Sequence, residues 1–186
     1  MKILCISDIH SNLAALKQIQ EKIPEIKPDL VVCLGDVVGY AAEPNEVCSI
    51  IREIADVTLL ANHDAAVGGI LNFDYYYPAA RNALYWTKQV LDKSHIQWLK
   101  GLPYTYSQEE CFFSHGDPTA PERFDYIYMS SQVYPLIEAF DSMKRVTFIG
   151  HSHLTKTFAF NKSSVMEVQG EAFDLEPDWK YVVTVG

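Results

Sequence analysis

Residues of the types that bind metal ions stand directly after short apolar stretches in five places along the chain. These motifs are Asp8-Ile9-His10, Gly35-Asp36, Asn62-His63-Asp64, His115-Gly116 and Gly150-His151-Ser152-His153. Five of the six histidines fall within them. Short apolar runs indicate β-strands, and open α/β folds bind their ligands beyond the carboxyl ends of strands. The pattern therefore predicts one polar site built from several strand ends.

Carboxylate, imidazole and amide groups together suit divalent ions such as Mn²⁺, Fe²⁺, Zn²⁺ or Ni²⁺. No cysteine joins the set, which argues against a structural zinc site. A two-residue offset in an extended segment would put Asp8 and His10 on one side of the chain, and the same holds for His151 and His153. The glycines on either side of Asp36 allow tight turns around it.

Each motif taken alone has a simpler explanation. Asp8 and Asp36 could be turn residues, Asn62 could begin a helix, and His115 could be a hydrogen-bonded core histidine. Only the closely spaced pair His151 and His153 favours metal binding by itself. The five motifs occur together, each at a predicted strand end, and five independent coincidences would be needed to explain that.

The first part of the chain alternates strands and helices. Apolar runs predict strands at 2–7, 29–34 and 57–60, and helical spacing predicts helices at 12–23 and 44–55. Pro24 is expected to end the first helix. This β-α-β-α-β order predicts a parallel sheet.

The second part becomes rich in strands, which are expected to be antiparallel. Helices are predicted at 78–91, 94–101 and 130–140, and strands at 104–106, 111–114, 145–149, 156–160, 163–168 and 181–185. The predicted fold class is α/β (α+β), with two mixed sheets flanked by helices. Because no linker or repeat interrupts the 186 residues, we expect a single domain, 1–186.

Composition limits the function classes. Hydrophobic residues make up 48% of the chain, which is ordinary for a globular domain. The formal charge of −9 without a basic block argues against extended nucleic-acid binding, and hence against a nuclease. No apolar run is long enough to cross a bilayer, and the start does not read as a signal peptide, so we expect a cytoplasmic protein. Its four cysteines are expected to be reduced, buried thiols.

The five motifs, in this order, resemble the signature of the calcineurin-like metallophosphoesterase superfamily: D-x-H, G-D-x-x-G, G-N-H-D/E, a lone His, and G-H-x-H. The sequence around these motifs is similar to that of a bacterial and archaeal branch of small phosphodiesterases and dinucleoside-polyphosphatase-like proteins. The segments that carry this likeness are 35–40, 43–46, 80–83 with Trp86 and Thr87, and 114–118. The resemblance implies a four-layer α-β-β-α sandwich.

The resemblance also implies roles for individual residues. Asp8, His10, Asp36 and His153 would hold one divalent ion, and Asp36, Asn62, His115 and His151 a second, with manganese first among Mn, Fe, Ni, Zn and Mg. His63 would contact the substrate phosphate and protonate the leaving oxygen, and Asp64 would orient His63. A hydroxide bridging the ions would attack the phosphorus.

The implied activity is hydrolysis of a phosphate ester or anhydride: a phosphodiester, a phosphomonoester or a dinucleoside polyphosphate. The alternative is a scaffold protein with this fold and little or no catalysis. Two departures from the family pattern stand out: Ala61 replaces a glycine, and the chain ends at Gly186, where relatives continue into further strands. A missing strand would leave a sheet edge that favours homo-oligomers.

Aromatic residues follow two of the motifs. The preferred interpretation of the clusters around Tyr76 and Tyr126 is that these side chains pack in the interior. The alternative is that they form surfaces on which a nucleobase stacks beside the metals. In the second interpretation Arg81 and Arg123 would hold a phosphate chain. The expected partner is a small phosphorylated molecule of the nucleotide type.

Overall fold

The computed structural model describes residues 1–170 and 172–186. The chain divides into two compact units, Met1–Pro103 and Tyr104–Gly186, and each unit contains one β-sheet. The predicted α/β fold with two sheets and accompanying helices is confirmed. The expectation of a single domain, 1–186, stays a prediction.

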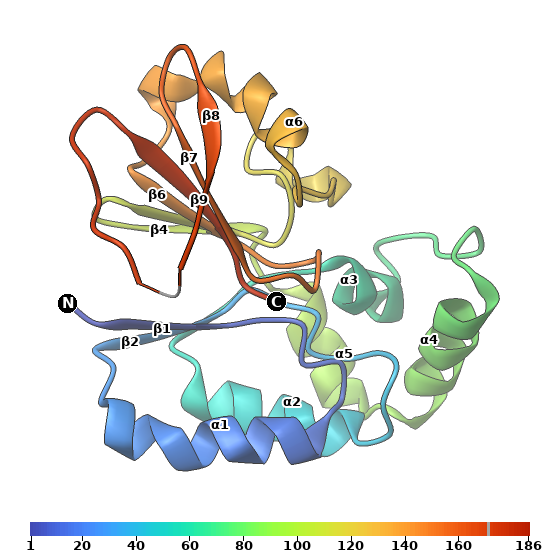
Figure 1. Cartoon of the computed structure of the whole chain (residues 1–186). Helices are drawn as coiled ribbons and strands as arrows, with labels where there is room; N and C mark the ends of the chain where they lie inside the picture. The colour runs from blue at the N-terminus through green and yellow to red at the C-terminus, as the bar shows by residue number, and fades with distance from the viewer. Residues whose placement is uncertain (171) are drawn as a thin grey trace. The chain divides into compact units, whose positions relative to one another are not determined.

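The first unit is built on a parallel three-stranded sheet of β1 (Ile3–Ile6), β2 (Leu30–Cys33) and β3 (Val57–Thr58). The connecting helices α1 (Leu13–Ile26) and α2 (Pro44–Ile54) run along one face of this sheet (Figure 1). Apolar residues of both helices meet the strands in one core; they include Ile6, Leu16, Val31, Val47 and Ile51. The parallel sheet predicted from the β-α-β-α-β order is therefore confirmed.

Helix α1 continues past the proline that was expected to end it. Pro24 lies inside the helix, which closes at Lys27, a residue in the left-handed region whose N–H donates to the Ile23 carbonyl. A proline removes one backbone donor. In the last turn this loss is tolerated, so the boundary predicted at Ile23 was wrong by one turn.

Three further helices complete the first unit: α3 (Asn62–Gly68), α4 (Pro78–Val90) and α5 (Lys93–Lys100). Helix α3 begins almost directly after β3. The polar motif Asn62-His63-Asp64 therefore occupies the first turn of α3, at the carboxyl end of the sheet.

The second unit holds a mixed six-stranded sheet in the order β4-β5-β6-β9-β7-β8. Its strands are β4 (Thr105–Gln108), β5 (Cys111–Ser114), β6 (Val146–Ile149), β7 (Lys156–Phe160), β8 (Val165–Val168) and β9 (Lys180–Thr184). The expected antiparallel arrangement holds only in part, because β6 pairs in parallel with both β5 and β9. The two neighbours of β6 are joined to it through long connections, which permit parallel pairing.

The helix predicted at 130–140 is broken into short pieces. Only α6 (Ser130–Val133) is α-helical, and 3₁₀ turns follow at Tyr134–Ile137 and Phe140–Ser142. Pro135 explains the break, because it cannot donate to the carbonyl four residues earlier. A third 3₁₀ turn, Pro121–Arg123, lies in the connection after β5. Apolar side chains from this connection and the sheet form the unit's core: Ile127, Val133, Leu136, Ile149, Phe158, Phe160 and Val182.

Cys33 and Cys48 are fully buried, and burial raises the pKa of both thiols, so they remain protonated at neutral pH. Cys5 and Cys111 are only half-buried, so the expectation that all four thiols are buried was wrong for these two. None of the described helices combines the length and the apolar character that crossing a bilayer requires.

His95, the histidine outside the five motifs, is a buried packing residue. Its Nδ1 accepts from the Arg52 guanidinium at 3.3 Å, and its Nε2 faces the Ser49 hydroxyl at 3.3 Å. Burial, and then the Arg52 charge, lower the pKa of His95, while Asp92 opposes them. The imidazole is therefore neutral in the folded protein at pH 7.

This lowered pKa predicts acid sensitivity. The folded protein resists protonation of His95, so its contribution to stability is complete above the unfolded pKa of about 6.5 and is lost as the pH falls through the lower folded pKa. In urea unfolding with EDTA present, wild type should lose more free energy of unfolding between pH 7.5 and pH 5 than His95→Gln. Equal losses would contradict this.

Candidate metal centre

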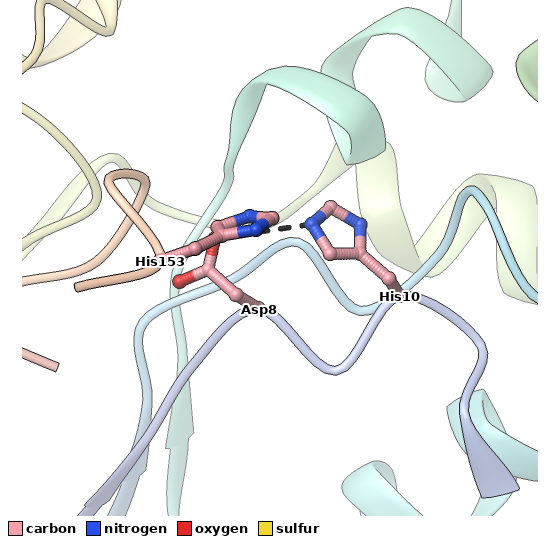
Figure 2. A group of neighbouring side chains, drawn as sticks. All are labelled: Asp8, His10 and His153. Atoms are coloured by element: carbon pink, nitrogen blue, oxygen red, sulfur yellow. Dashed lines mark ion pairs between the residues drawn. The ribbon is translucent and has the colours of Figure 1, made fainter. Parts of the chain in front are cut away.

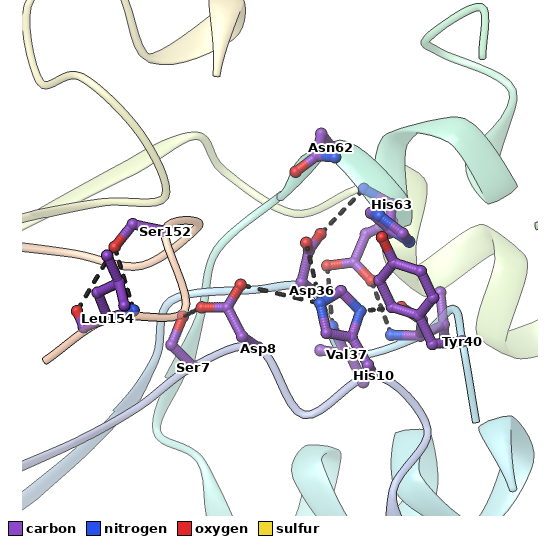
Figure 3. A network of polar contacts seen from close by, with 12 residues as sticks. Ser7, Asp8, His10, Asp36, Val37, Tyr40, Asn62, His63, Ser152 and Leu154 are labelled. Atoms are coloured by element: carbon purple, nitrogen blue, oxygen red, sulfur yellow. Dashed lines mark hydrogen bonds and ion pairs between the residues drawn. The ribbon is translucent and has the colours of Figure 1, made fainter. Parts of the chain in front are cut away.

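The loops that leave β1 and β2 stay paired beyond the strands. The N–H of Asp8 donates to the Gly35 carbonyl at 3.0 Å, and the N–H of His10 donates to the Asp36 carbonyl at 2.9 Å. This backbone pairing brings the first two motifs together at one edge of the sheet. Their side chains are seen from close by in Figure 3.

Five of the predicted ligands have backbones in the left-handed region: Asp8 (φ 54°), His10 (φ 49°), Asp36 (φ 50°), His151 (φ 68°) and His153 (φ 53°). The extended backbone expected at 8–10 and 151–153 was therefore wrong, because the chain turns sharply at these positions. A positive φ is uncommon outside glycine, and such residues cluster at functional sites. The turns predicted around Asp36 are present, with φ values of 102° at Gly35 and 96° at Gly39.

The His10 imidazole has a defined orientation. Its Nδ1 lies 3.1 Å from the Val38 carbonyl oxygen, which can only accept, so Nδ1 carries the proton. Its Nε2 lies 3.6 Å from Asp36 Oδ2 (Figure 3) and 3.9 Å from Asp8 Oδ1 (Figure 2). One nitrogen fixed by a carbonyl and the other directed at two carboxylates is an arrangement that suits a divalent cation.

Asp36 and His63 are tied through the backbone. The N–H of His63 donates to Asp36 Oδ1 at 2.9 Å (Figure 3), which leaves Oδ2 on the His10 side. One ligand-type atom from each of His10, Asp36 and His63 lies within 4.8 Å of the others. A side chain at Gly39 would collide with the His63 ring, so this glycine gives the imidazole its space.

Asn62 presents a buried amide oxygen. Its Nδ2 donates to the Tyr76 hydroxyl at 3.0 Å, while Oδ1 has no hydrogen-bond partner among the described residues. A buried oxygen that accepts no hydrogen bond is suited to bind a cation. The residue before it, Ala61, is extended with φ −114°, so alanine replaces the family's glycine without strain.

Asp64 holds the loop that carries Asp36. It is fully buried, and its two carboxylate oxygens accept the N–H groups of Val37 at 3.3 Å and Val38 at 3.2 Å. The carboxylate thereby connects the first turn of α3 to the turn after β2. Its expected role in orienting His63 stays a prediction.

Removing the Asp64 carboxylate should destabilise the fold. Asp64→Ala leaves two buried N–H groups without their charged acceptor, and we expect a loss of roughly 2–4 kcal/mol in the free energy of unfolding. Urea unfolding in EDTA measures it without interference from metal ions. Asp141→Ala is the control, because Asp141 is 81% exposed and pairs with Lys162 at the surface. A loss below about 0.5 kcal/mol, as for an ordinary surface change, would contradict the role.

The second unit assembles its own histidine pair. The N–H of Gly150 donates to the His115 carbonyl at 2.9 Å, and the rings of His115 and His151 lie 4.9 Å apart. Both residues are buried, whereas His153 is exposed. A side chain on Gly116 would come within 2.8 Å of the Asp125 carbonyl, so the loop packs closely beside His115.

The predicted substrate contacts stay predictions. Tyr126 stacks face to face on His151, with ring centroids 3.7 Å apart. Arg81 donates to the Asp74 carbonyl at 3.1 Å. Arg123 is an exposed side chain that forms an ion pair with Asp125 at 2.9 Å.

Tyr40 is a neighbour of the site to which the sequence analysis gave no role. Its ring centroid lies 4.7 Å from those of both His10 and His63, and its hydroxyl lies 2.6 Å from the Tyr77 hydroxyl. Tyr40 is 40% exposed, so it borders solvent. Its position directly after Gly39, within the Asp36 motif, is the signal that could have identified it.

The comparisons with known proteins agree with this geometry. The model of the calcineurin-like phosphoesterase family matches residues 1–183. The chain belongs to this family. A protein of Methanocaldococcus jannaschii that is described only as uncharacterized is 31% identical over 188 residues, which cover 99% of this chain and 74% of that protein.

Solved structures point to the same family. The crystal structure of a metallophosphoesterase from Sphaerobacter thermophilus is 31% identical, with a TM-score of 0.79 over 99% of this chain and 75% of that one. A protein provisionally assigned as a diadenosine tetraphosphatase shares the fold, with a TM-score of 0.60, 14% identity, and coverage of 98% of this chain and 82% of that one. Calcineurin-like phosphoesterases use divalent metals, and the described Asp and His clusters could hold them.

Proposed function

We propose that this chain is a hydrolase that uses two divalent metal ions to cleave a phosphate ester or anhydride. The observation that carries the proposal is the arrangement of His10, whose Nε2 is directed at the carboxylates of Asp8 and Asp36 within 3.9 Å. The proposed ligands are the seven residues of the family signature: Asp8, His10, Asp36, Asn62, His115, His151 and His153.

The chain's own groups supply the rest of the proposed chemistry. Bound divalent cations would supply Lewis acidity toward the phosphoryl oxygens and lower the pKa of coordinated water. The His63 imidazole, in the first turn of α3, would donate a proton to the leaving oxygen. An aromatic leaving group would pack against the exposed phenols of Tyr40 and Tyr77, whose hydroxyls lie 2.6 Å apart.

We further propose a nucleotide-type substrate, with dinucleoside polyphosphates as the first to test. The support is the Tyr40–Tyr77 pair near His63, together with the assignment of a structural neighbour as a diadenosine tetraphosphatase. The net charge of −9 disfavours a long nucleic acid.

The test is hydrolysis of bis(4-nitrophenyl) phosphate, 4-nitrophenyl phosphate and diadenosine tetraphosphate by EDTA-treated protein to which Mn²⁺ is returned. Turnover that requires the metal supports the proposal. Folded protein that turns over none of the three with Mn²⁺, Fe²⁺, Ni²⁺, Zn²⁺ or Mg²⁺ rejects it in favour of a scaffold. Cleavage of the aryl esters alone rejects only the nucleotide assignment.

A further inference from the structure

The Asn62 amide is satisfied on one side only. Asn62 is 5% exposed, its Nδ2 donates to the Tyr76 hydroxyl at 3.0 Å, and its Oδ1 is buried without a hydrogen-bond partner among the described residues. Leaving a buried acceptor unsatisfied costs about 1–3 kcal/mol. A native protein therefore needs a reason to keep this oxygen open.

The direction of the amide decides whether Asn62 can bind a cation. Only the carbonyl oxygen of a carboxamide offers lone pairs, because its nitrogen is a donor. An asparagine turned the other way would direct two N–H groups at the position of the cation. In the structure Nδ2 donates to the Tyr76 hydroxyl, and in this orientation Oδ1 points away from the phenol.

Tyr76 is itself held in place. Its N–H donates to the Phe73 carbonyl at 3.0 Å, and its ring packs edge-on against Tyr75 at 5.1 Å and lies 5.9 Å from the His63 ring. Tyr76 is half-buried and belongs to the segment that connects α3 to α4. The hydroxyl that receives the Asn62 amide thus belongs to an ordered side chain.

We propose that Tyr76 is a positioning residue for one metal ion: its hydroxyl fixes the Asn62 amide with Oδ1 toward the cation and thereby raises metal affinity. The inference rests on the proposed function, because it takes Asn62 as a ligand. It gives Tyr76 a role distinct from stacking on a substrate. Partners that orient a metal ligand are typically worth 10–100-fold in affinity.

Mn²⁺ titration of EDTA-treated protein, followed by calorimetry and by the electron paramagnetic resonance signal of free Mn²⁺, tests the inference without any substrate. Tyr76→Phe keeps the ring and removes only the hydroxyl. We expect it to weaken one of the two binding steps by about 10–100-fold and to leave the other within about threefold of wild type.

Tyr85→Phe is the matched control, because it also deletes a phenol hydroxyl, one that donates to Asp74 at 2.8 Å at the surface. It should bind Mn²⁺ like wild type. In an Asn62→Asp background the effect of Tyr76→Phe should shrink to about threefold or less, since both oxygens of a carboxylate can bind a cation and no orientation is needed.

The outcomes separate the two proposals. Wild-type protein that binds none of Mn²⁺, Fe²⁺, Ni²⁺, Zn²⁺ and Mg²⁺ overturns both of them. Wild type that binds two ions while Tyr76→Phe binds them equally well overturns the role of Tyr76 alone. Should Tyr76→Phe fold poorly, 3-fluorotyrosine at position 76 keeps the side chain in place with a weaker acceptor, and it must still weaken the same step.

Discussion

Asp36→Asn should reduce metal-dependent hydrolysis by more than about 100-fold, beyond the loss expected for a residue that only supports a ligand. The fold should survive, because an amide oxygen can still accept the His63 N–H that now binds Oδ1 at 2.9 Å. On the other side, Oδ2 faces His10 Nε2 at 3.6 Å, and a donor NH₂ there would replace an anionic ligand. Metal analysis should find fewer ions per chain than in wild type.

Asp141→Asn provides the comparison for Asp36→Asn, since it makes the same chemical change at an exposed carboxylate. It should retain wild-type activity and metal content. An Asp36→Asn protein that keeps two bound Mn²⁺ ions and more than a tenth of wild-type kcat would remove Asp36 from the metal centre.

His63→Asn should separate proton transfer from metal binding. The backbone N–H of His63, and not its side chain, donates to Asp36, so removing the imidazole leaves that hydrogen bond intact. We expect kcat to fall by about 10²–10⁴-fold, the usual contribution of a positioned acid, with metal content unchanged. The measurements are steady-state kinetics and metal analysis on the same preparation.

The leaving group provides a sharper readout for His63. A 4-nitrophenolate departs with little help from a proton, whereas an alkoxide needs one, so the penalty of His63→Asn should be smaller for 4-nitrophenyl esters than for alkyl esters. The same penalty for both esters would show that His63 binds phosphate and does not protonate the leaving oxygen. A loss of metal would instead make His63 a ligand.

Much of the first unit follows from its sequence. The alternation of apolar strands with amphipathic helices predicted the parallel sheet, and polar residues after β1, β2 and β3 marked the edge at which they gather. These features depend on local pattern and on the rule that parallel strands end at one edge. Pattern could not reveal that Pro24 stays helical or that Pro135 breaks a helix, because the position within a helix decides the cost.

The details around the candidate site were less accessible to sequence reasoning. Asp8 and His10 were expected side by side and do lie close together, but left-handed turns achieve it. The expected action of Asp64 on His63 stays a prediction, and its hydrogen bonds to the loop carrying Asp36 are contacts that the sequence did not indicate. Such contacts join residues about 27 positions apart and leave no periodic trace in the sequence.

The left-handed backbone at five of the predicted ligands bears on which amino acids evolution could place there. Asp, Asn and His are the side-chain-bearing residues that best tolerate this conformation, and the five positions hold only Asp and His. Glutamate, an equally good oxygen donor, is absent from them. An exchange of Asp for Glu at one of these positions would keep the charge but would place a longer side chain on a left-handed backbone.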